Sequence, residues 1–206
     1  HKAVLDTCRQ LEREGYEVTY LDPDEQGLTT PDMVKAALRE DTILVSIMHA
    51  NNEIGAIQPI AEISRVCREA GVLCHTDAAQ SLGKTQVDVK QLGVDFLTLA
   101  GHKLYAPKGV GALYIRDGLK LESLIHGAAH EFGVRAGTEN TAYWVGLGEA
   151  CRLLTAEGIQ HYQTLREKRD LLWQRLAASI PEITVNGKFE DVDQDSRNRL
   201  PNTLSV

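Results

Sequence analysis

The feature that most constrains the fold of this chain is a regular alternation of helix-like and strand-like segments over residues 2–115. Apolar residues at helical spacing before Gly15 predict a helix over residues 2–14. Thr30 followed by Pro31 is typical of a helix start and predicts a helix through about Arg39. A further helix is predicted at 59–71, and strands are predicted at 16–21, 42–48, 72–76, 94–99 and 110–115. This alternation favours an α/β fold with a mostly parallel sheet.

One strand and the C-terminal part of the chain differ from the rest. Segment 42–48 is almost entirely apolar, which predicts a strand covered on both faces. Two long helical patterns follow Thr141, and a short strand at 183–185 and a charged loop at 190–199 come after them. We therefore expect a large domain over 1–157 and the beginning of a smaller α+β domain over 158–206.

Composition narrows the function classes. The chain has 206 residues and a formal net charge of −7, which argues against a broad nucleic-acid surface or a basic membrane-binding face. No apolar run is long enough to span a bilayer. The four cysteines are widely spaced within apolar segments, which favours reduced thiols and a cytoplasmic location. His126, His130 and Glu131 could suggest a metal site, but no further ligand at a familiar metal-binding spacing supports it, so we expect none.

Polar residues cluster where consecutive strands end. Asn52 follows the strand at 42–48, Asp77 and Gln80 follow the strand at 72–76, and His102 and Lys103 follow the strand at 94–99. In open α/β sheets ligands bind beyond the carboxyl ends of the strands. Each residue alone has an ordinary explanation, such as a turn cap or a solvated surface lysine. Together, a lysine on a glycine-containing turn and an acid at the neighbouring strand end suit a pyridoxal phosphate (PLP) site.

Five segments carry a resemblance to a known family. They are His1–Leu5, Met48–Gly55, His75–Ser81, Gly101–Lys103 and Arg135–Thr141. In this order they resemble the cysteine desulfurases, which are fold-type-I PLP enzymes of the class V aminotransferase group. The resemblance implies a three-layer α/β fold and extends over essentially the whole chain.

The resemblance also implies a role for each matching residue. Lys103 would be the lysine that binds the cofactor covalently and moves protons at the substrate α-carbon. Asp77 would pair with the pyridine nitrogen, Gln80 would contact the ring oxygen, and Asn52 would lie near that oxygen and the substrate carboxylate.

The remaining matches lie farther from the ring. His102 would contact the cofactor phosphate, and His1 would stack on the ring and take part in proton transfer. Thr138 would reach the phosphate of a partner subunit, which implies a homodimer. The implied reaction converts L-cysteine to L-alanine and passes sulfur through an enzyme cysteine to iron–sulfur scaffold or other acceptor proteins.

Several family features are missing or altered. The sulfur-accepting cysteine and the substrate-binding arginine are expected beyond Val206, and the phosphate-cradling loop is expected before His1. Both ends therefore suggest a piece of a longer chain. Ala100 stands where the family usually has Ser or Thr, and Phe132 replaces a usual arginine.

Two other functions stay open from the sequence. A selenocysteine lyase, or a class V aminotransferase with another amino-acid substrate, would use the same scaffold. A truncated, non-catalytic dimerisation or docking module would also fit the incomplete chain.

Overall fold

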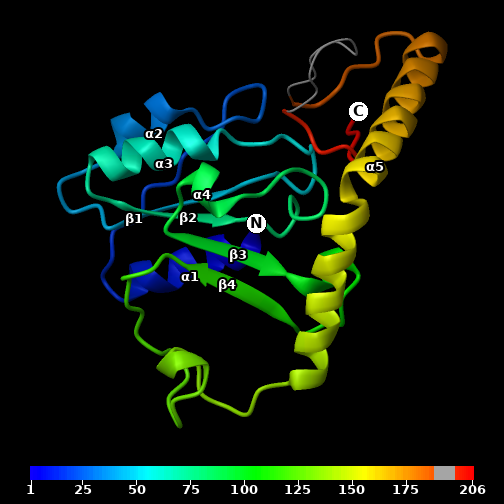
Figure 1. The fold of residues 1–206 in the computed structure, drawn as a ribbon. Helices are drawn as coiled ribbons and strands as arrows, with labels where there is room; N and C mark the ends of the chain where they lie inside the picture. Colours follow the sequence, from blue (N-terminus) through cyan, green and yellow to red (C-terminus); the bar gives the residue numbers. More distant parts are fainter. Residues whose placement is uncertain (188–197) are drawn as a thin grey trace.

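The computed structural model describes residues 1–187 and 198–206, with a four-stranded sheet at its centre (Figure 1). The strands are β1 (Leu44–Met48), β2 (Leu73–Asp77), β3 (Phe96–Ala100) and β4 (Gly111–Ile115), and they lie side by side in this order. β1, β2 and β3 run parallel, and β4 is antiparallel to β3. The predicted α/β class and the mostly parallel sheet are confirmed.

The helices follow the start and stop signals of the sequence. They are α1 (Lys2–Arg13), α2 (Pro31–Ala37), α3 (Ile60–Glu69), α4 (Val89–Leu92) and α5 (Thr141–Ser179), with 3₁₀ segments η1 (Gly101–Leu104) and η2 (Glu131–Gly133). The Thr30 hydroxyl accepts a hydrogen bond from the Met33 amide at 3.2 Å, so the predicted cap of α2 is confirmed. The short helix α4 was not predicted; the Asp88 carboxylate caps it by accepting from the Lys90 amide.

Helices α2 and α3 lie on one face of the sheet (Figure 1). Alternate strand residues such as Cys74 point to this face and join a buried core with Val34, Ile60 and Ile63. On the opposite face, Leu44 remains exposed. The prediction that both faces of the 42–48 strand would be covered is therefore wrong, because α2 and α3 share one face.

Two predicted strands are absent from the described residues. Residues 16–20 pair with no other strand, and Tyr16 and Tyr20 are exposed. Residues 183–185 also lack strand pairing, although the Asn186 amide donates to the Ser205 carbonyl at 2.9 Å. Most of the charged loop predicted at 190–199 lies outside the described residues. An extended segment becomes a strand only when its backbone pairs with a neighbouring strand. Neither 16–21 nor 183–185 has such a neighbour among the described residues, so both predicted strands are absent.

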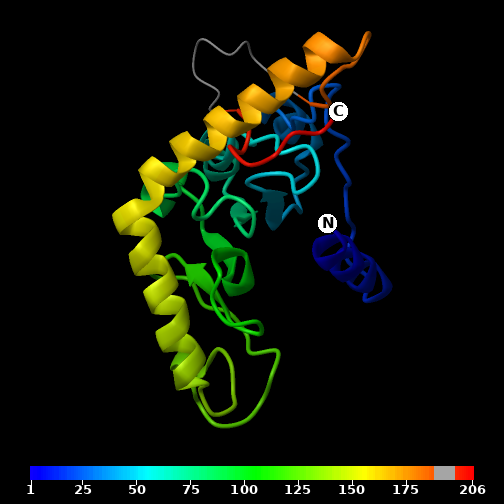
Figure 2. The ribbon, with the colours of Figure 1, turned by 90° about the vertical axis from the view of Figure 1, so that its right-hand side faces the viewer.

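The two helical patterns after residue 141 form one continuous helix, α5 (Figures 1 and 2). Asn140 caps its start by accepting from the Tyr143 amide. Leu147, Ala150 and Leu154 lie at helical spacing and pack against Leu104 of η1. This contact fixes η1 at the end of β3. The domain boundary near residue 158 lies within α5 and stays a prediction.

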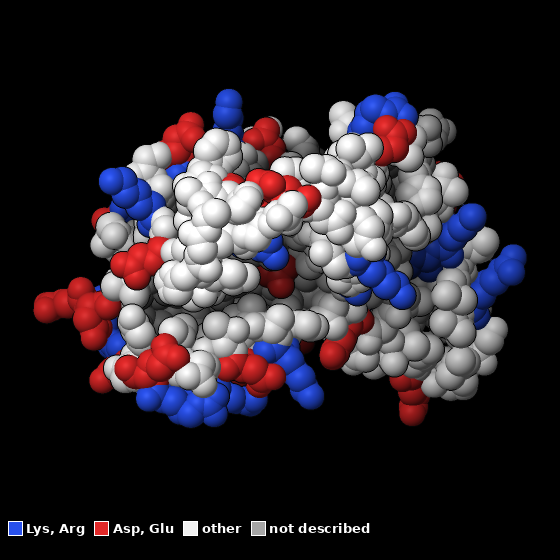
Figure 3. Space-filling model, turned by 90° about the horizontal axis from the view of Figure 1, so that it is seen from below, with Lys and Arg blue, Asp and Glu red and all other residues white. Residues whose placement is uncertain are grey.

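The periphery of the molecule is loosely covered. Figure 2 shows α1 standing apart from the strands, and none of its residues is buried. Figure 3 shows acidic and basic side chains interspersed on one face of the molecule, with broad uncharged areas between them. Among the described residues, no helix has both the length and the apolar character needed to cross a bilayer.

Candidate active site

The carboxyl ends of the three parallel strands meet at one edge of the sheet, as the sequence predicts. The amide of His49, just after β1, donates to the Asp77 carbonyl at 2.8 Å. The amide of Ala78, just after β2, donates to the Thr98 carbonyl of β3 at 2.9 Å. These bonds hold the three strand-end segments side by side. The edge therefore presents side chains from segments that lie far apart in the sequence.

Asp77 is the last residue of β2 and its side chain is fixed by the following turn. Its Oδ1 accepts a hydrogen bond from the Ala79 amide at 2.9 Å. Within the described part of the chain, its Oδ2 accepts no hydrogen bond. Asp77 therefore holds one carboxylate oxygen in a fixed position and leaves the other available to a ligand.

A row of hydrogen-bonded side chains crosses the three parallel strands next to Asp77. His75 lies two residues earlier on the same face of β2, and its ring bridges two hydroxyls, Ser46 Oγ at 2.8 Å and Thr98 Oγ1 at 2.9 Å. Burial lowers the pKa of His75, and the negative charge of Asp77 opposes that shift. This role of His75 was not predicted from the sequence. Its spacing of two from Asp77 was the available signal.

Lys103 and His102 lie on the single 3₁₀ turn η1 that follows β3. Both side chains are exposed, whereas Leu104 is buried and anchors the turn. A Cβ atom at Gly101 would lie 2.7 Å from the Val110 carbonyl oxygen, so this close approach requires glycine. The Gly-His-Lys segment thus fits tightly at its glycine and carries the exposed Lys103 directly after the end of β3.

A second lysine joins this edge. Lys84 Nζ donates to Gln80 Oε1 at 2.8 Å. The pKa of Lys84 is lowered, first by burial and then by the positive charge of Lys103. Lys84 therefore lies within electrostatic range of Lys103 as well as in contact with Gln80. Lys84 was not predicted as a site residue, although it follows Gln80 by four residues in a turn-rich segment.

A buried pair supports the edge from below. His49 Nδ1 lies 2.9 Å from Ser81 Oγ, and both residues are buried. Burial lowers the pKa of His49 to about 4. The neutral ring thus joins the segment after β1 to the turn after β2, and stabilises the turn that carries Gln80.

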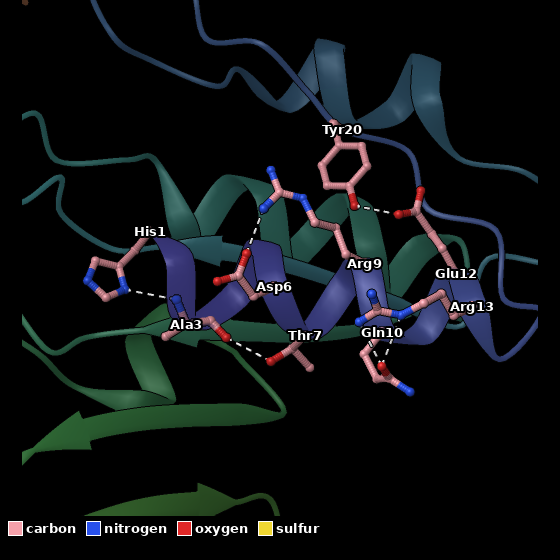
Figure 4. A network of polar contacts seen from close by, with 9 residues as sticks. All are labelled: His1, Ala3, Asp6, Thr7, Arg9, Gln10, Glu12, Arg13 and Tyr20. Carbon is pink, nitrogen blue, oxygen red and sulfur yellow. Dashed lines mark hydrogen bonds and ion pairs between the residues drawn. The ribbon is translucent and has the colours of Figure 1, made fainter.

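Among the described residues, no side-chain hydrogen bond joins the other predicted site residues to the strand edge. Asn52 is exposed in the turn after β1, and its neighbour Asn51 accepts from the amides of Glu53 and Ile54. His1 caps α1 by accepting from the Ala3 amide at 3.2 Å (Figure 4). In the described residues, no hydrogen bond joins His1 to Asp77, Gln80 or Lys103.

Thr138 is exposed in the long loop between β4 and α5. The loop is held mainly by its own contacts, such as the Gly137 amide donating to His130 Nδ1 at 3.3 Å. Glu131 and Phe132 adopt left-handed backbone conformations, and Phe132 is fully exposed. Thr138 is thus separate from the strand edge within this single chain.

The fold and the strand-edge site define a PLP-binding α/β protein of fold type I, and comparison with known proteins gives the family. The class V aminotransferase model matches residues 1–200, so this chain belongs to the class V aminotransferase family. A curated cysteine desulfurase IscS of Aeromonas hydrophila is 50% identical over 208 aligned residues, which cover all of this chain and 50% of the relative. The chain spans about half the length of the curated relatives it matches.

Solved structures agree with this assignment. The structure of SspA in complex with cysteine is 49% identical with a TM-score of 0.72, and the match covers 74% of this chain and 44% of SspA. DndA from Streptomyces lividans is 37% identical with a TM-score of 0.85, and the match covers 98% of this chain and 55% of DndA. The family resemblance expected from the motifs is therefore confirmed.

The donor set at the strand edge fits PLP, the cofactor of this family. The edge offers a primary amine at Lys103, a carboxylate oxygen of Asp77 without a hydrogen bond, and the Gln80 amide. The amine can react with the PLP aldehyde, the carboxylate can accept from the protonated ring nitrogen, and the amide can donate to the ring oxygen. The chemistry of the residues present therefore agrees with the cofactor that the family uses.

Proposed function

We propose that this chain forms the cofactor-binding part of a PLP-dependent cysteine desulfurase, which converts L-cysteine to L-alanine. The observation that carries the proposal is the meeting of Lys103, Asp77 and Gln80 at one sheet edge, in a chain of the class V aminotransferase family. The relatives named cysteine desulfurase and the cysteine complex of SspA support L-cysteine as the substrate.

The residues at the edge would each meet a separate need of the reaction. When bound, the cofactor supplies an electron sink for charge at the substrate α-carbon. Asp77 would keep the pyridine nitrogen protonated through its Oδ2. Gln80 would donate to the ring oxygen. Lys103 would attach the cofactor and then carry a proton to and from the α-carbon.

Four further residues would complete the site. Asn52 would lie near the ring oxygen and the substrate carboxylate, and His102 would bind the phosphate. His1 would stack on the ring and exchange protons with the substrate. Thr138 would reach the phosphate of a second copy of the chain. These roles are transferred from the family motifs to the matching positions of this sequence.

The sulfur step requires a thiol that the strand edge does not offer. An enzyme thiol would take the substrate sulfur to give a persulfide, and L-cysteine would become L-alanine. Cys67 and Cys74 are buried in the core, and their contact, together with burial, raises the pKa of Cys74 well above its usual range. Cys8 and Cys151 lie on α1 and α5. We therefore assign the accepting thiol to none of the four.

The partners follow from the same chemistry. We propose a homodimer, because Thr138 and the exposed Leu124 and Phe132 lie on a loop that its own chain leaves uncovered. The persulfide sulfur would pass to iron–sulfur scaffold or other sulfur-acceptor proteins. Free cysteines at all four positions agree with a reducing, cytoplasmic location.

The absorption spectrum of protein mixed with PLP tests the cofactor site. Covalent attachment to Lys103 should give a visible band, and Lys103→Ala should abolish it completely. Lys120→Ala is the matched control, because Lys120 is an exposed lysine outside the strand edge. A band that survives in Lys103→Ala would overturn the assignment, and a band lost equally in Lys120→Ala would show that its loss is not specific to Lys103.

Product analysis separates the remaining functions. Release of L-alanine from L-cysteine, with sulfide appearing only when an added thiol reductant such as dithiothreitol reduces the persulfide, supports the desulfurase. Turnover confined to L-selenocysteine would indicate a selenocysteine lyase, and transfer of the amino group of another substrate would indicate an aminotransferase. A protein that gives no band with PLP and yet dimerises would support the non-catalytic module.

A further inference from the structure

We propose that Lys84 is a positioning residue that fixes the orientation of the Gln80 side-chain amide for the cofactor ring. The inference rests on the proposed function, because it concerns how Gln80 meets the cofactor. It starts from the hydrogen bond between Lys84 Nζ and Gln80 Oε1, which measures 2.8 Å.

The chemistry of the two groups leaves one orientation of the amide. A lysine ammonium has three donors and no acceptor, so it bonds only to the oxygen of a glutamine amide. With Oε1 facing Lys84, the Nε2 group of Gln80 is left for another partner, and it donates to no other described residue. An amide without this neighbour presents either end with similar ease. Lys84 therefore selects the donor end of Gln80, which is the end that a phenolic ring oxygen requires.

The backbone holds Lys84 in place. Residues 78–85 form consecutive tight turns, in which Ser81 accepts from the Lys84 and Thr85 amides at 2.9 and 3.0 Å. Gly83 has a left-handed conformation with φ of +76°, and a Cβ there would lie 2.8 Å from a methyl carbon of Leu154. The turn is thus packed against α5 and η1, which also carries Lys103. Lys84 is therefore fixed relative to both Gln80 and Lys103.

The environment of Lys84 distinguishes it from a solvated surface lysine. Its side chain is partly buried, and both burial and the charge of Lys103 lower its pKa. An ammonium that loses part of its hydration and faces a second positive charge needs an acceptor to remain there. The structure provides that acceptor in Gln80 Oε1. The hydrogen bond thus gives the Lys84 ammonium an acceptor and holds the Gln80 amide in one orientation.

Three variants of Lys84 test the inference. Lys84→Met removes the donor, and we expect PLP to bind about three- to tenfold more weakly, in line with the loss of one oriented hydrogen bond. Lys84→Arg retains donors without acceptors and should bind PLP within about twofold of the wild type. Lys84→Gln presents either a donor or an acceptor and should fall between them. Thermal unfolding confirms that each variant is folded.

A double-mutant cycle separates orientation from charge. In a Gln80→Ala background there is no amide to orient, so Lys84→Met should change the PLP dissociation constant by less than about twofold. Equal weakening in both backgrounds would show that Lys84 acts through its charge alone and would overturn the inference. The proposed function would then still stand, since it is judged by the loss of the band in Lys103→Ala.

The cofactor-free protein provides an independent measurement. In protein labelled with ¹⁵N-glutamine, the Gln80 side-chain amide signals should shift in Lys84→Met and stay near their wild-type positions in Lys84→Arg. Unchanged Gln80 signals in Lys84→Met would also overturn the inference. This readout needs no bound PLP, so it tests the inference even if the wild-type protein forms no visible band.

Discussion

The strand edge and the loop at 116–140 are built in opposite ways. At the edge, the side chains of Asp77, Gln80 and His49 each have a hydrogen-bond partner within the chain. In the loop, Leu124 and Phe132 are almost fully exposed, and two non-glycine residues have left-handed backbone conformations. Strained backbone and exposed apolar side chains persist when another surface completes them.

The chain as a whole also exposes more surface than a compact monomer of its mass would. The described structure exposes 13574 Å². A compact monomer of 22.7 kDa would expose about 9,500 Å². The excess is summed over the whole chain, including α1, of which no residue is buried. The contrast between the edge and the loop therefore rests on their own hydrogen bonds and exposure.

The largest expected effect tests the edge. Asp77→Asn retains an oxygen that can accept from the Ala79 amide, so the turn should survive. The neutral amide, however, would not hold a proton on the pyridine nitrogen, and turnover of L-cysteine should fall at least about 100-fold. Steady-state alanine release measures this in PLP-loaded full-length protein that carries the accepting thiol. Asp117→Asn, in an exposed loop, is the control, and turnover within twofold of wild type in Asp77→Asn would refute the role.

The second effect tests how firmly the edge is supported from below. Burial lowers the pKa of His49 from 6.5 to about 4, so the folded protein resists protonation of this ring while the unfolded chain accepts the proton. Stability should therefore be complete above about pH 6.5 and fall as the pH decreases toward about 4. The loss should approach about 3 kcal/mol.

Urea unfolding at pH 7.0, 5.5 and 4.5 measures this loss, and His49→Gln should reduce the pH dependence by most of that amount. His126→Gln provides a control, because it makes the same substitution at an exposed histidine. If His49→Gln and the wild type lose stability in parallel, the edge does not depend on a neutral His49. The support that distinguishes the edge from the loop would then come from other contacts.

The two regions also differ in how far the sequence predicts them. Local signals located the strand ends, because periodicity and caps depend on neighbouring residues such as Thr30 and Pro31. Parallel pairing then brought Asp77 and Lys103 to one edge, as expected. The contacts of His75 and Lys84 depend on side chains meeting across strands and turns, which spacing alone does not reveal.

Other errors have the same cause. The strand expected at 16–21 had suitable residues but found no neighbouring edge, and the strand at 42–48 was apolar without being covered on both faces. Pairing and coverage are properties of the assembled molecule. The cofactor and substrate roles of all the predicted site residues stay predictions. Among the described residues, no hydrogen bond joins His1, Asn52 or Thr138 to Asp77 or Lys103.

The smallest effect tests the loop. If the loop at 116–140 is covered by a second copy of the chain, burying the Phe132 side chain should stabilise the dimer by about 2 kcal/mol. Phe132→Asp should then raise the dimer dissociation constant about 30-fold, because the charge would have to be buried at the interface. Analytical ultracentrifugation over a concentration series measures this constant. Ile43→Asp, at an exposed apolar residue just before β1, is the control for a general loss of apolar surface.

An equal shift in both variants, or none in Phe132→Asp, would mean that the exposed loop is not a dimer contact. The contrast with the strand edge would then need a different partner to explain it.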